Sequence, residues 1–185
     1  MRIPLHLAVV VALQTLALVA MVAMKQWTLQ TGTPVLLKTE PVDPRSLFRG
    51  DYVILNYAIN DLAQGTLAGD DDFERHDPIH VLLREDTPYW QPVSLHRERP
   101  EVPPGHVAIK GEVLYSGSMM VDGAPSITVR FGIENYFVPE GEGRALEQPA
   151  EDEEISILVA VDRRGNAGIK AVLVNGEVRY QERLF

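Results

Sequence analysis

An uninterrupted apolar stretch near the N-terminus, residues 7–24, constrains this chain more than any other feature. Its sequence, LAVVVALQTLALVAMVAM, contains no charged residue, and only Gln14 and Thr15 are polar. With the apolar residues 3–5 in front of it, a helix here is long enough to cross a hydrocarbon core of about 30 Å. We therefore expect a membrane-spanning helix surrounded by the lipid bilayer.

A cleaved secretory signal is the alternative interpretation of this stretch. The apolar region of such a signal usually spans about 7–15 residues and ends in a small-x-small cleavage site. Here the run is longer, and the nearest candidate sites, around Ala20 and Ala23, place Met or Val at the critical positions. The sequence favours an uncleaved anchor over residues 1–26, a polar linker at 27–33 and a second domain at 34–185.

The charge of the remaining chain bears on its side of the membrane. All 26 acidic residues follow residue 26, together with 15 of the 17 basic ones, an excess of 11 negative charges with histidine neutral. In the sequence, no basic cluster that would bind an anionic cytoplasmic surface adjoins the anchor. We expect a cytoplasmic N-terminus and, in a bacterium, a periplasmic domain attached to the inner membrane. The acidic excess also argues against a nucleic-acid partner.

Short apolar segments separated by proline, glycine and aspartate follow the anchor. Thirteen prolines and fourteen glycines lie mainly between these segments, which is typical of strands joined by turns. No long amphipathic helix is evident, so we predict an all-β domain, a mostly antiparallel barrel or sandwich. The predicted strands cover residues 35–39, 52–59, 79–84, 90–97, 107–115, 126–133, 155–161, 169–174 and 178–180.

Three turns in the sequence join neighbouring strands into hairpins. Asn175-Gly176 supplies the positive φ angles of a type I′ turn between two apolar-rich arms. The segment DRRGNAG, residues 162–168, is predicted to turn the preceding pair, and MMVDGAPS, residues 119–126, to join the strands at 107–115 and 126–133.

The segment DPRSLFRG, residues 43–50, has the features of a single helical turn that leads into a strand. Asp43 can cap a helix and Pro44 suits its first position, while Gly50 can end the turn in a left-handed conformation. Asp51 can then hydrogen-bond the backbone N–H groups of the turn, or it can present its carboxylate to a ligand or partner.

The strand at residues 52–59 carries apolar side chains on one face and a half-apolar set on the other. Because side chains alternate along a strand, Leu55 and Tyr57 share the apolar face with residues 53 and 59. Tyr52 points to the opposite face and is the aromatic residue that we expect at an interface. This composition predicts a central strand covered on both sides.

Residues 50–57, GDYVILNY, match the signature after which the GDYXXLXY family of bacterial membrane-anchored proteins is named, and the chain resembles that family. The blocks PVDPRSLFRGDY (residues 41–52) and FGIENYFVPEGEGRALE (residues 131–147) and the last strand pair are also similar to the family's recurring segments. The resemblance covers nearly the whole chain after the anchor. It implies a multi-span membrane protein as partner, but no reaction.

The second of these blocks contains a candidate interaction surface. Glu140 and Arg144 are four residues apart, a spacing that supports an ion pair if a short helix forms. An exposed pair of this kind contributes only about 0.3–0.5 kcal/mol to stability. Together with Glu147, these residues are therefore candidates for a polar surface that a partner contacts.

One segment suggests an enzyme. SGSMM, residues 116–120, resembles the nucleophile segment of type I signal peptidases, and RGDYVILNY resembles a later strand of those enzymes. Ser118 would then be a nucleophile activated by a neutral lysine. In those enzymes, however, the serine segment precedes the other strand, and the lysines after the anchor, Lys38, Lys110 and Lys170, lie in no matching context. We predict a non-catalytic accessory protein, with a membrane-anchored serine-lysine peptidase as an alternative.

A ligand-binding or metal-binding sensor is a further alternative, suggested by His76 and His80 beside several acidic residues. Two histidines four residues apart on a helix can bind a divalent metal, but Pro78 and the apolar strand after it oppose a helix. The chain has no cysteine, and it lacks the common nucleotide-binding and metallopeptidase motifs. We expect no metal site and no cofactor.

The membrane segment itself has features of a helix-helix contact. Ala8 and Ala12 have small-xxx-small spacing, and Gln14 offers side-chain hydrogen bonds where water is absent. Helices associate in bilayers through such groups, so Gln14 is the predicted contact with a membrane partner.

Overall fold

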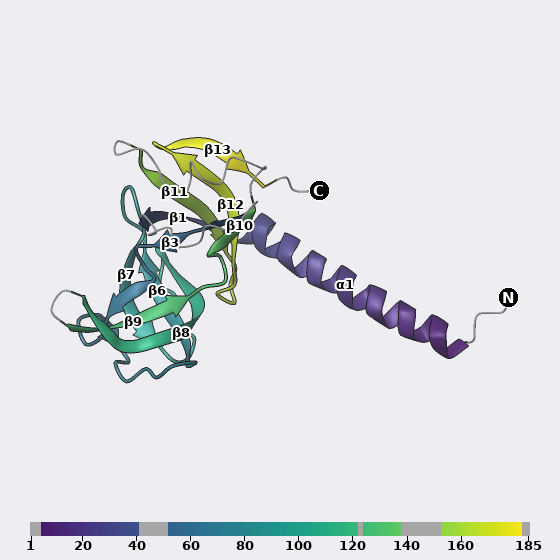
Figure 1. The fold of residues 1–185 in the computed structure, drawn as a ribbon, viewed down its shortest axis with the longest axis horizontal. Coiled ribbons are helices and arrows are strands. Elements are labelled where there is room, and N and C mark those ends of the chain that lie inside the picture. The colour runs from purple at the N-terminus through teal and green to yellow at the C-terminus, as the bar shows by residue number, and fades with distance from the viewer. Residues whose placement is uncertain (1–4, 41–51, 122–123, 138–152, 183–185) are drawn as a thin grey trace.

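The computed structural model describes residues 5–40, 52–121, 124–137 and 153–182, and Figure 1 shows one long helix projecting from a domain of strands. Helix α1 spans Leu5–Thr31, and its part from Val9 to Thr31 is long and apolar enough to cross a membrane. The described apolar side chains of residues 7–24 are exposed all around this helix. The predicted apolar helix is confirmed.

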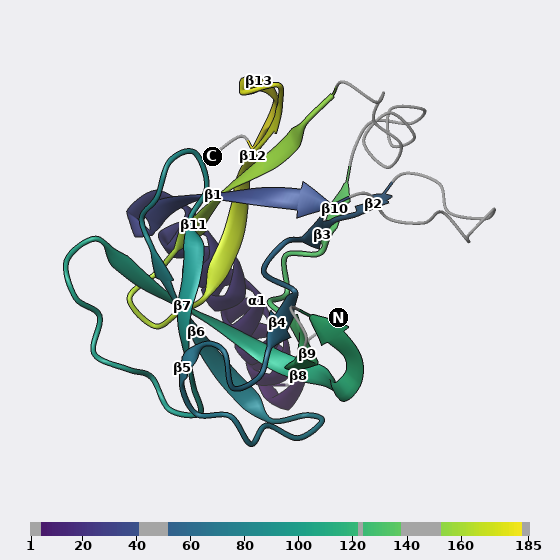
Figure 2. The ribbon, with the colours of Figure 1, turned by 90° about the vertical axis from the view of Figure 1, so that its left-hand side faces the viewer.

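Two sheets and one short strand pair form the domain. The first sheet consists, in order, of β13 (Glu177–Gln181), β12 (Ala167–Val174), β11 (Ile155–Val161), β1 (Thr33–Glu40) and β3 (Asn56–Tyr57). The second consists of β4 (Asp61–Ala63), β9 (Ala124–Arg130), β8 (His106–Val121), β6 (Pro78–Arg84), β7 (Gln91–His96) and β5 (Ala68–Gly69). β10 (Asn135–Phe137) and β2 (Tyr52–Ile54) form a separate pair beside the tip of β1 (Figure 2).

Within the described ranges, every strand pair is antiparallel except β5 with β7. The prediction of a mostly antiparallel all-β domain is therefore confirmed. One core lies between the sheets, because alternate residues of each strand point inward. Val35 and Leu37 of β1 and Ile157 of β11 enter it from the first sheet, and Val81 of β6 and Ile109 of β8 from the second.

The three predicted hairpins are present in the strand pairing. Asn175 and Gly176 have φ angles of 52° and 79° and connect β12 to β13, as a type I′ turn requires. β11 pairs with β12 across residues 162–166, and β8 pairs with β9 up to Val121 opposite Ala124. These turns could be predicted because the turn residues, and the alternation of apolar and polar residues in the strands beside them, lie within a few positions of each other in the sequence.

Several predicted boundaries differ from the structure. The strand at 107–115 continues to Val121, and the segment 52–59 is divided into β2 and β3. Three strands were not predicted, β4, β5 and β10, because two or three residues are too few to show a period of two.

The polar segment 27–33 is not the irregular linker that we expected. Helix α1 continues to Thr31, and β1 begins at Thr33. The Gly32 N–H donates to the Thr28 carbonyl at 2.9 Å, so a single residue separates helix from strand. The helix continues here because its last turn packs on the domain, which its polar composition does not reveal.

Candidate functional site: the signature segment and the helix junction

The signature segment forms the corner at which the chain passes between the two sheets. β2 pairs with β10, β3 pairs with β1 of the first sheet, and β4, directly after them, pairs with β9 of the second sheet. Figure 2 shows β2 and β3 beside the tip of β1, with β4 leading on toward the second sheet. The chain therefore pairs with three different strands in turn between Tyr52 and Ala63.

Our prediction of a central strand covered on both sides is wrong. β3 lies at the end of the first sheet, and β2 belongs to the two-stranded pair. The face with Leu55 and Tyr57 is buried as predicted, but on the other face Asn56 is half-buried and Ala58 is exposed. A corner segment has neighbours on its inner face only, which explains the difference.

Tyr57 is the buried polar residue of the signature. Its hydroxyl donates a hydrogen bond of 2.6 Å to the carbonyl of Ile133, and 1% of the residue is exposed. Burial, with a smaller contribution from the charge of Glu134, raises the pKa of the phenol well above its ordinary value. Tyr57 is therefore neutral, and it ties the corner to the segment before β10.

Asn60 completes this corner, and the sequence analysis did not single it out. The Tyr57 N–H donates to its Oδ1 at 2.5 Å, and its Nδ2 donates to the Val129 carbonyl at 2.7 Å. The Val129 N–H in turn donates to the Asn60 carbonyl at 2.7 Å. The available signal was the polar pair Asn60 and Asp61 between the apolar residues Ile59 and Leu62.

Three other signature residues, Gly50, Asp51 and Tyr52, lie wholly or partly outside the described residues. Tyr52 begins β2, but its side chain lies outside the described part, as do Gly50 and Asp51 entirely. The predicted polar surface of Glu140, Arg144 and Glu147 also lies outside the described residues. Their roles at an interface remain predictions.

The candidate nucleophile Ser118 lies in the second half of β8, after Gly117, whose φ angle is 72°. The side chain of Ser118 lies outside the described part. Lys38 has its ammonium group 4.0 Å from a Glu154 carboxylate oxygen, and Lys110 and Lys170 lie in β8 and β12. The peptidase alternative gains no support from a described contact.

The two candidate metal-binding histidines have separate surroundings. His76 lies in a turn with a φ angle of 73°, and its Nδ1 is 2.8 Å from Glu112, which also accepts a hydrogen bond from Arg130. His80 lies in β6 opposite His96 of β7. Among the described residues, no three His, Cys, Asp or Glu side chains are grouped to hold a metal ion.

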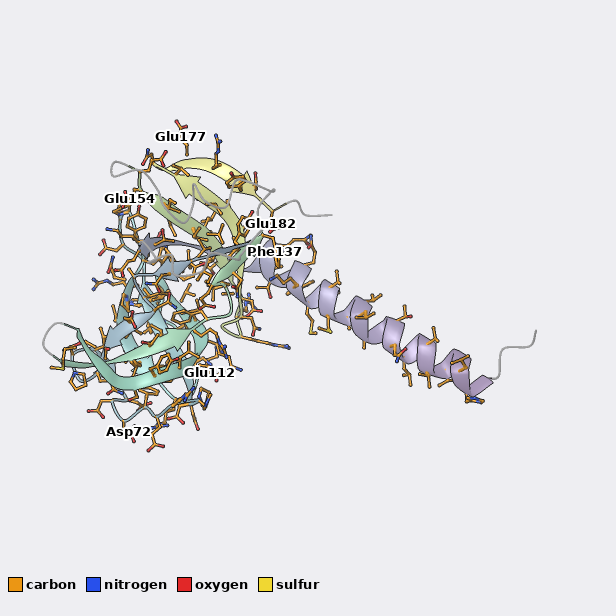
Figure 3. The ribbon with its side chains drawn as sticks, viewed as in Figure 1. Asp72, Glu112, Phe137, Glu154, Glu177 and Glu182 are labelled. Carbon is orange, nitrogen blue, oxygen red and sulfur yellow. The ribbon has the colours of Figure 1, made fainter. Side chains whose placement is uncertain are left out.

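The acidic loop at residues 69–74 is fastened to the domain by one arginine. Arg97 Nη1 lies 2.5 Å from Asp77 Oδ2, and Arg97 Nη2 lies 3.0 Å from Asp72 Oδ1. The Arg97 guanidinium also lies over the Phe73 ring, 5.2 Å from its centre. These contacts give the loop a structural role, and Figure 3 shows Asp72 at the surface of the domain.

The second feature that joins distant parts of the chain is the junction of α1 with the β11–β12 hairpin. The Thr28 hydroxyl donates to Asp162 Oδ2 at 2.8 Å, and Leu29 of the same turn is buried. A side chain at Gly168 of β12 would have its Cβ 2.8 Å from Leu29 Cδ2, so a larger residue here would have to displace the end of the leucine side chain. Gln26 also reaches the junction, with its Nε2 buried and without a hydrogen-bond partner among the described atoms.

Asp162 organises the turn that receives the helix. Its Oδ1 accepts hydrogen bonds from the N–H groups of Arg164 and Asn166, at 2.8 and 3.0 Å. Burial tends to raise the pKa of this carboxyl, but the hydrogen bonds from Asn166, Thr28 and the backbone outweigh burial and lower it below its ordinary value. Asp162 is therefore charged at neutral pH, and it connects the hairpin to the helix.

The fold and these two features define a mostly β domain that is fastened directly to the end of an N-terminal helix able to cross a membrane. A family model described as GDYXXLXY protein matches residues 14–172. The chain therefore belongs to the GDYXXLXY family, as its signature predicted. Comparison with curated proteins and with solved structures finds no match.

Proposed function

We propose that this chain is a non-catalytic, membrane-anchored accessory protein of the bacterial envelope. In this proposal α1 spans the inner membrane, and the β domain lies against the periplasmic surface beside a multi-span membrane partner. The supporting observation is the junction, where α1 continues from its apolar part into a turn that is docked on the domain through Thr28 and Leu29. Helix and domain are thus joined without a flexible link.

The same observation supports retention of the helix in the mature protein. The candidate cleavage positions, Ala20 and Ala23, lie inside one continuous helix that extends to Thr31. We expect N-terminal sequencing of the purified membrane fraction to find the helix intact and carbonate washing to leave the chain in the membrane. A mature chain that begins after Met24 and appears in the soluble fraction would refute the anchor.

The proposed orientation rests on the acidic excess of the domain and on the absence of a polybasic segment of the usual four to eight residues. Fusions of alkaline phosphatase and of green fluorescent protein after Phe185 test it. We expect phosphatase activity without fluorescence. The opposite pattern would place the domain in the cytoplasm.

Gln14 is the group through which we expect α1 to contact its membrane partner. Its side chain is exposed on the helix, and an interhelical hydrogen bond in a bilayer contributes about 0.6–2 kcal/mol. Gln14→Leu should therefore reduce co-purification with multi-span proteins from the native membrane. Thr15→Val is the matched control, because the Thr15 hydroxyl already donates to the Val11 carbonyl at 2.9 Å. Equal yields of the same partners from both variants would exclude this role of Gln14.

A further inference from the structure

The fold places two arginines beside the end of the membrane helix, although the sequence separates them from it by more than 130 residues. Arg163 and Arg164 occupy the turn between β11 and β12, directly after Asp162, which accepts the hydrogen bond from Thr28 at 2.8 Å. Both arginines are exposed, and within the described ranges neither takes part in an ion pair.

The turn lies close to the level at which the apolar stretch ends. Met24 is the last apolar residue of that stretch, and Lys25 follows it. Thr28 is three residues beyond Lys25, which corresponds to about 4.5 Å along a helix axis. Lys25 and Trp27 are both exposed on this part of the helix, and such residues favour the headgroup region. The Asp162 turn is therefore near the headgroups if α1 spans the bilayer.

The backbone that carries the two arginines is held from both sides. The carboxylate of Asp162 binds the N–H groups of Arg164 and Asn166, and its carbonyl accepts the Gly165 N–H at 3.0 Å. On the other side, the Lys110 N–H of β8 donates to the Gly165 carbonyl at 2.9 Å. Since the turn is fixed, the arginine side chains are the groups that remain free to reach a ligand.

We propose that the turn at residues 162–166 binds the headgroups of anionic phospholipids through Arg163 and Arg164 and so orients the β domain on the bilayer surface. Guanidinium groups bind phosphate oxygens in pairs of parallel hydrogen bonds. The oxygens of Asp162 accept hydrogen bonds from Thr28, Asn166 and the turn N–H groups, and the two arginines still leave the turn with a net positive charge. The inference rests on the proposed membrane anchor and adds the lipid class to it.

Hydrogen–deuterium exchange of the full chain in lipid nanodiscs tests this site. One set of discs contains phosphatidylcholine alone, and the other contains about one third phosphatidylglycerol. Attraction to an anionic surface is worth about fivefold per basic residue, so we expect amides of the 162–168 turn to exchange at least fivefold more slowly in the anionic discs. The double substitution R163Q/R164Q should remove this difference.

A control variant, R84Q/R179Q, loses the same charge at a distance from the junction. Arg84 ends β6 opposite His106, four residues along β8 from Lys110. Arg179 lies in β13 beside Val172 and Leu173, toward the end of β12 that is away from the 162–166 turn, and Figure 3 shows Glu177 of the same strand at the top of the domain. This variant should keep the lipid-dependent slowing. Equal exchange of the turn in both discs, or slowing that persists in R163Q/R164Q, would overturn the lipid site. Failure of the chain to enter either disc would instead refute the anchor.

Discussion

The signature corner and the helix junction both use a polar side chain to join distant segments, but they differ in what they join. At the corner, Tyr57 and Asn60 are buried and bond to backbone atoms of the same domain. At the junction, Thr28 belongs to the last turn of α1, and its hydroxyl donates to the Asp162 carboxylate at the edge of the domain. The corner should therefore govern whether the domain folds, and the junction how the folded domain is held relative to α1.

The largest effect in this comparison is expected from Asn60→Ala. The substitution leaves the Tyr57 N–H and the Val129 carbonyl buried without partners, and each unsatisfied group costs about 1–3 kcal/mol. We expect the free energy of unfolding to fall by about 3 kcal/mol or more, measured by urea unfolding of the full chain in detergent micelles. Asn56→Ala, at a half-buried position of the same segment, is the control and should change stability by about 0.5 kcal/mol or less. Equal losses of stability from both variants would contradict the role of Asn60 as the hydrogen-bond partner of these two buried groups.

The next largest loss of stability is expected from Tyr57→Phe. It keeps the ring in the core but leaves the Ile133 carbonyl without its 2.6 Å hydrogen bond, so we expect a loss of about 1–2 kcal/mol in the same unfolding experiment. Tyr115→Phe is the control, because Tyr115 is exposed and its ring contacts Arg75. No loss from Tyr57→Phe would show that water replaces the phenol at this carbonyl.

The difference between the two regions also explains which parts of the structure could be predicted. The strand at 155–161 matches β11, and the Asn175-Gly176 turn was identified, because their signals lie within a few residues. The buried face of Leu55 and Tyr57 followed from alternation alone. Local patterns thus gave the fold class and the inner face of the signature.

The polar contacts of both regions could not be predicted. Asn60 is 69 residues from Val129, and Thr28 is 134 residues from Asp162. Contacts between residues so far apart produce no periodic pattern in the neighbouring sequence, and a single Asn or Thr is compatible with an ordinary turn or linker. The same reason explains why residues 27–33 were expected to be a linker and why Arg163 and Arg164 were not recognised as neighbours of helix α1.

At the junction, Gly168→Ala should have a smaller effect than the corner variants. The added Cβ would lie 2.8 Å from Leu29 Cδ2, and since this is the end of a flexible side chain, displacing it should cost about 1 kcal/mol, at the low end for overpacking. A double-mutant cycle with Leu29→Ala measures the contact, because removal of the leucine side chain relieves the overlap. Strictly additive losses would mean that the helix does not pack on β12 in the full chain.

The smallest effect is expected from Thr28→Val, which keeps the shape of the side chain but removes its hydrogen bond to Asp162. A hydrogen bond to a charged group contributes about 1.5–3 kcal/mol. This one is partly buried, and Asp162 keeps its bonds from Asn166 and the Arg164 N–H without it, so we expect a loss of about 0.5–1 kcal/mol. Thr31→Val is the control, because the Thr31 hydroxyl donates within the helix to the Trp27 carbonyl at 2.8 Å. The difference in unfolding free energy between Thr31→Val and the unchanged protein should therefore be the same at neutral and at acidic pH. Only Thr28→Val should show a difference that depends on pH.

The dependence of this last effect on pH follows from Asp162. Its pKa in the folded protein lies below the ordinary value, which is about 3.9 for an unfolded aspartate. A lowered carboxyl pKa contributes stability above the unfolded pKa, and this contribution is lost as the pH falls through the folded pKa. The difference between Thr28→Val and the unchanged protein should therefore be full at pH 7 and shrink in acid below the ordinary aspartate range. An NMR titration of the Asp162 carboxyl should show its pKa rising in Thr28→Val; an unchanged pKa would mean that Thr28 does not hold the carboxylate, and that packing of Leu29 alone joins the helix to the domain.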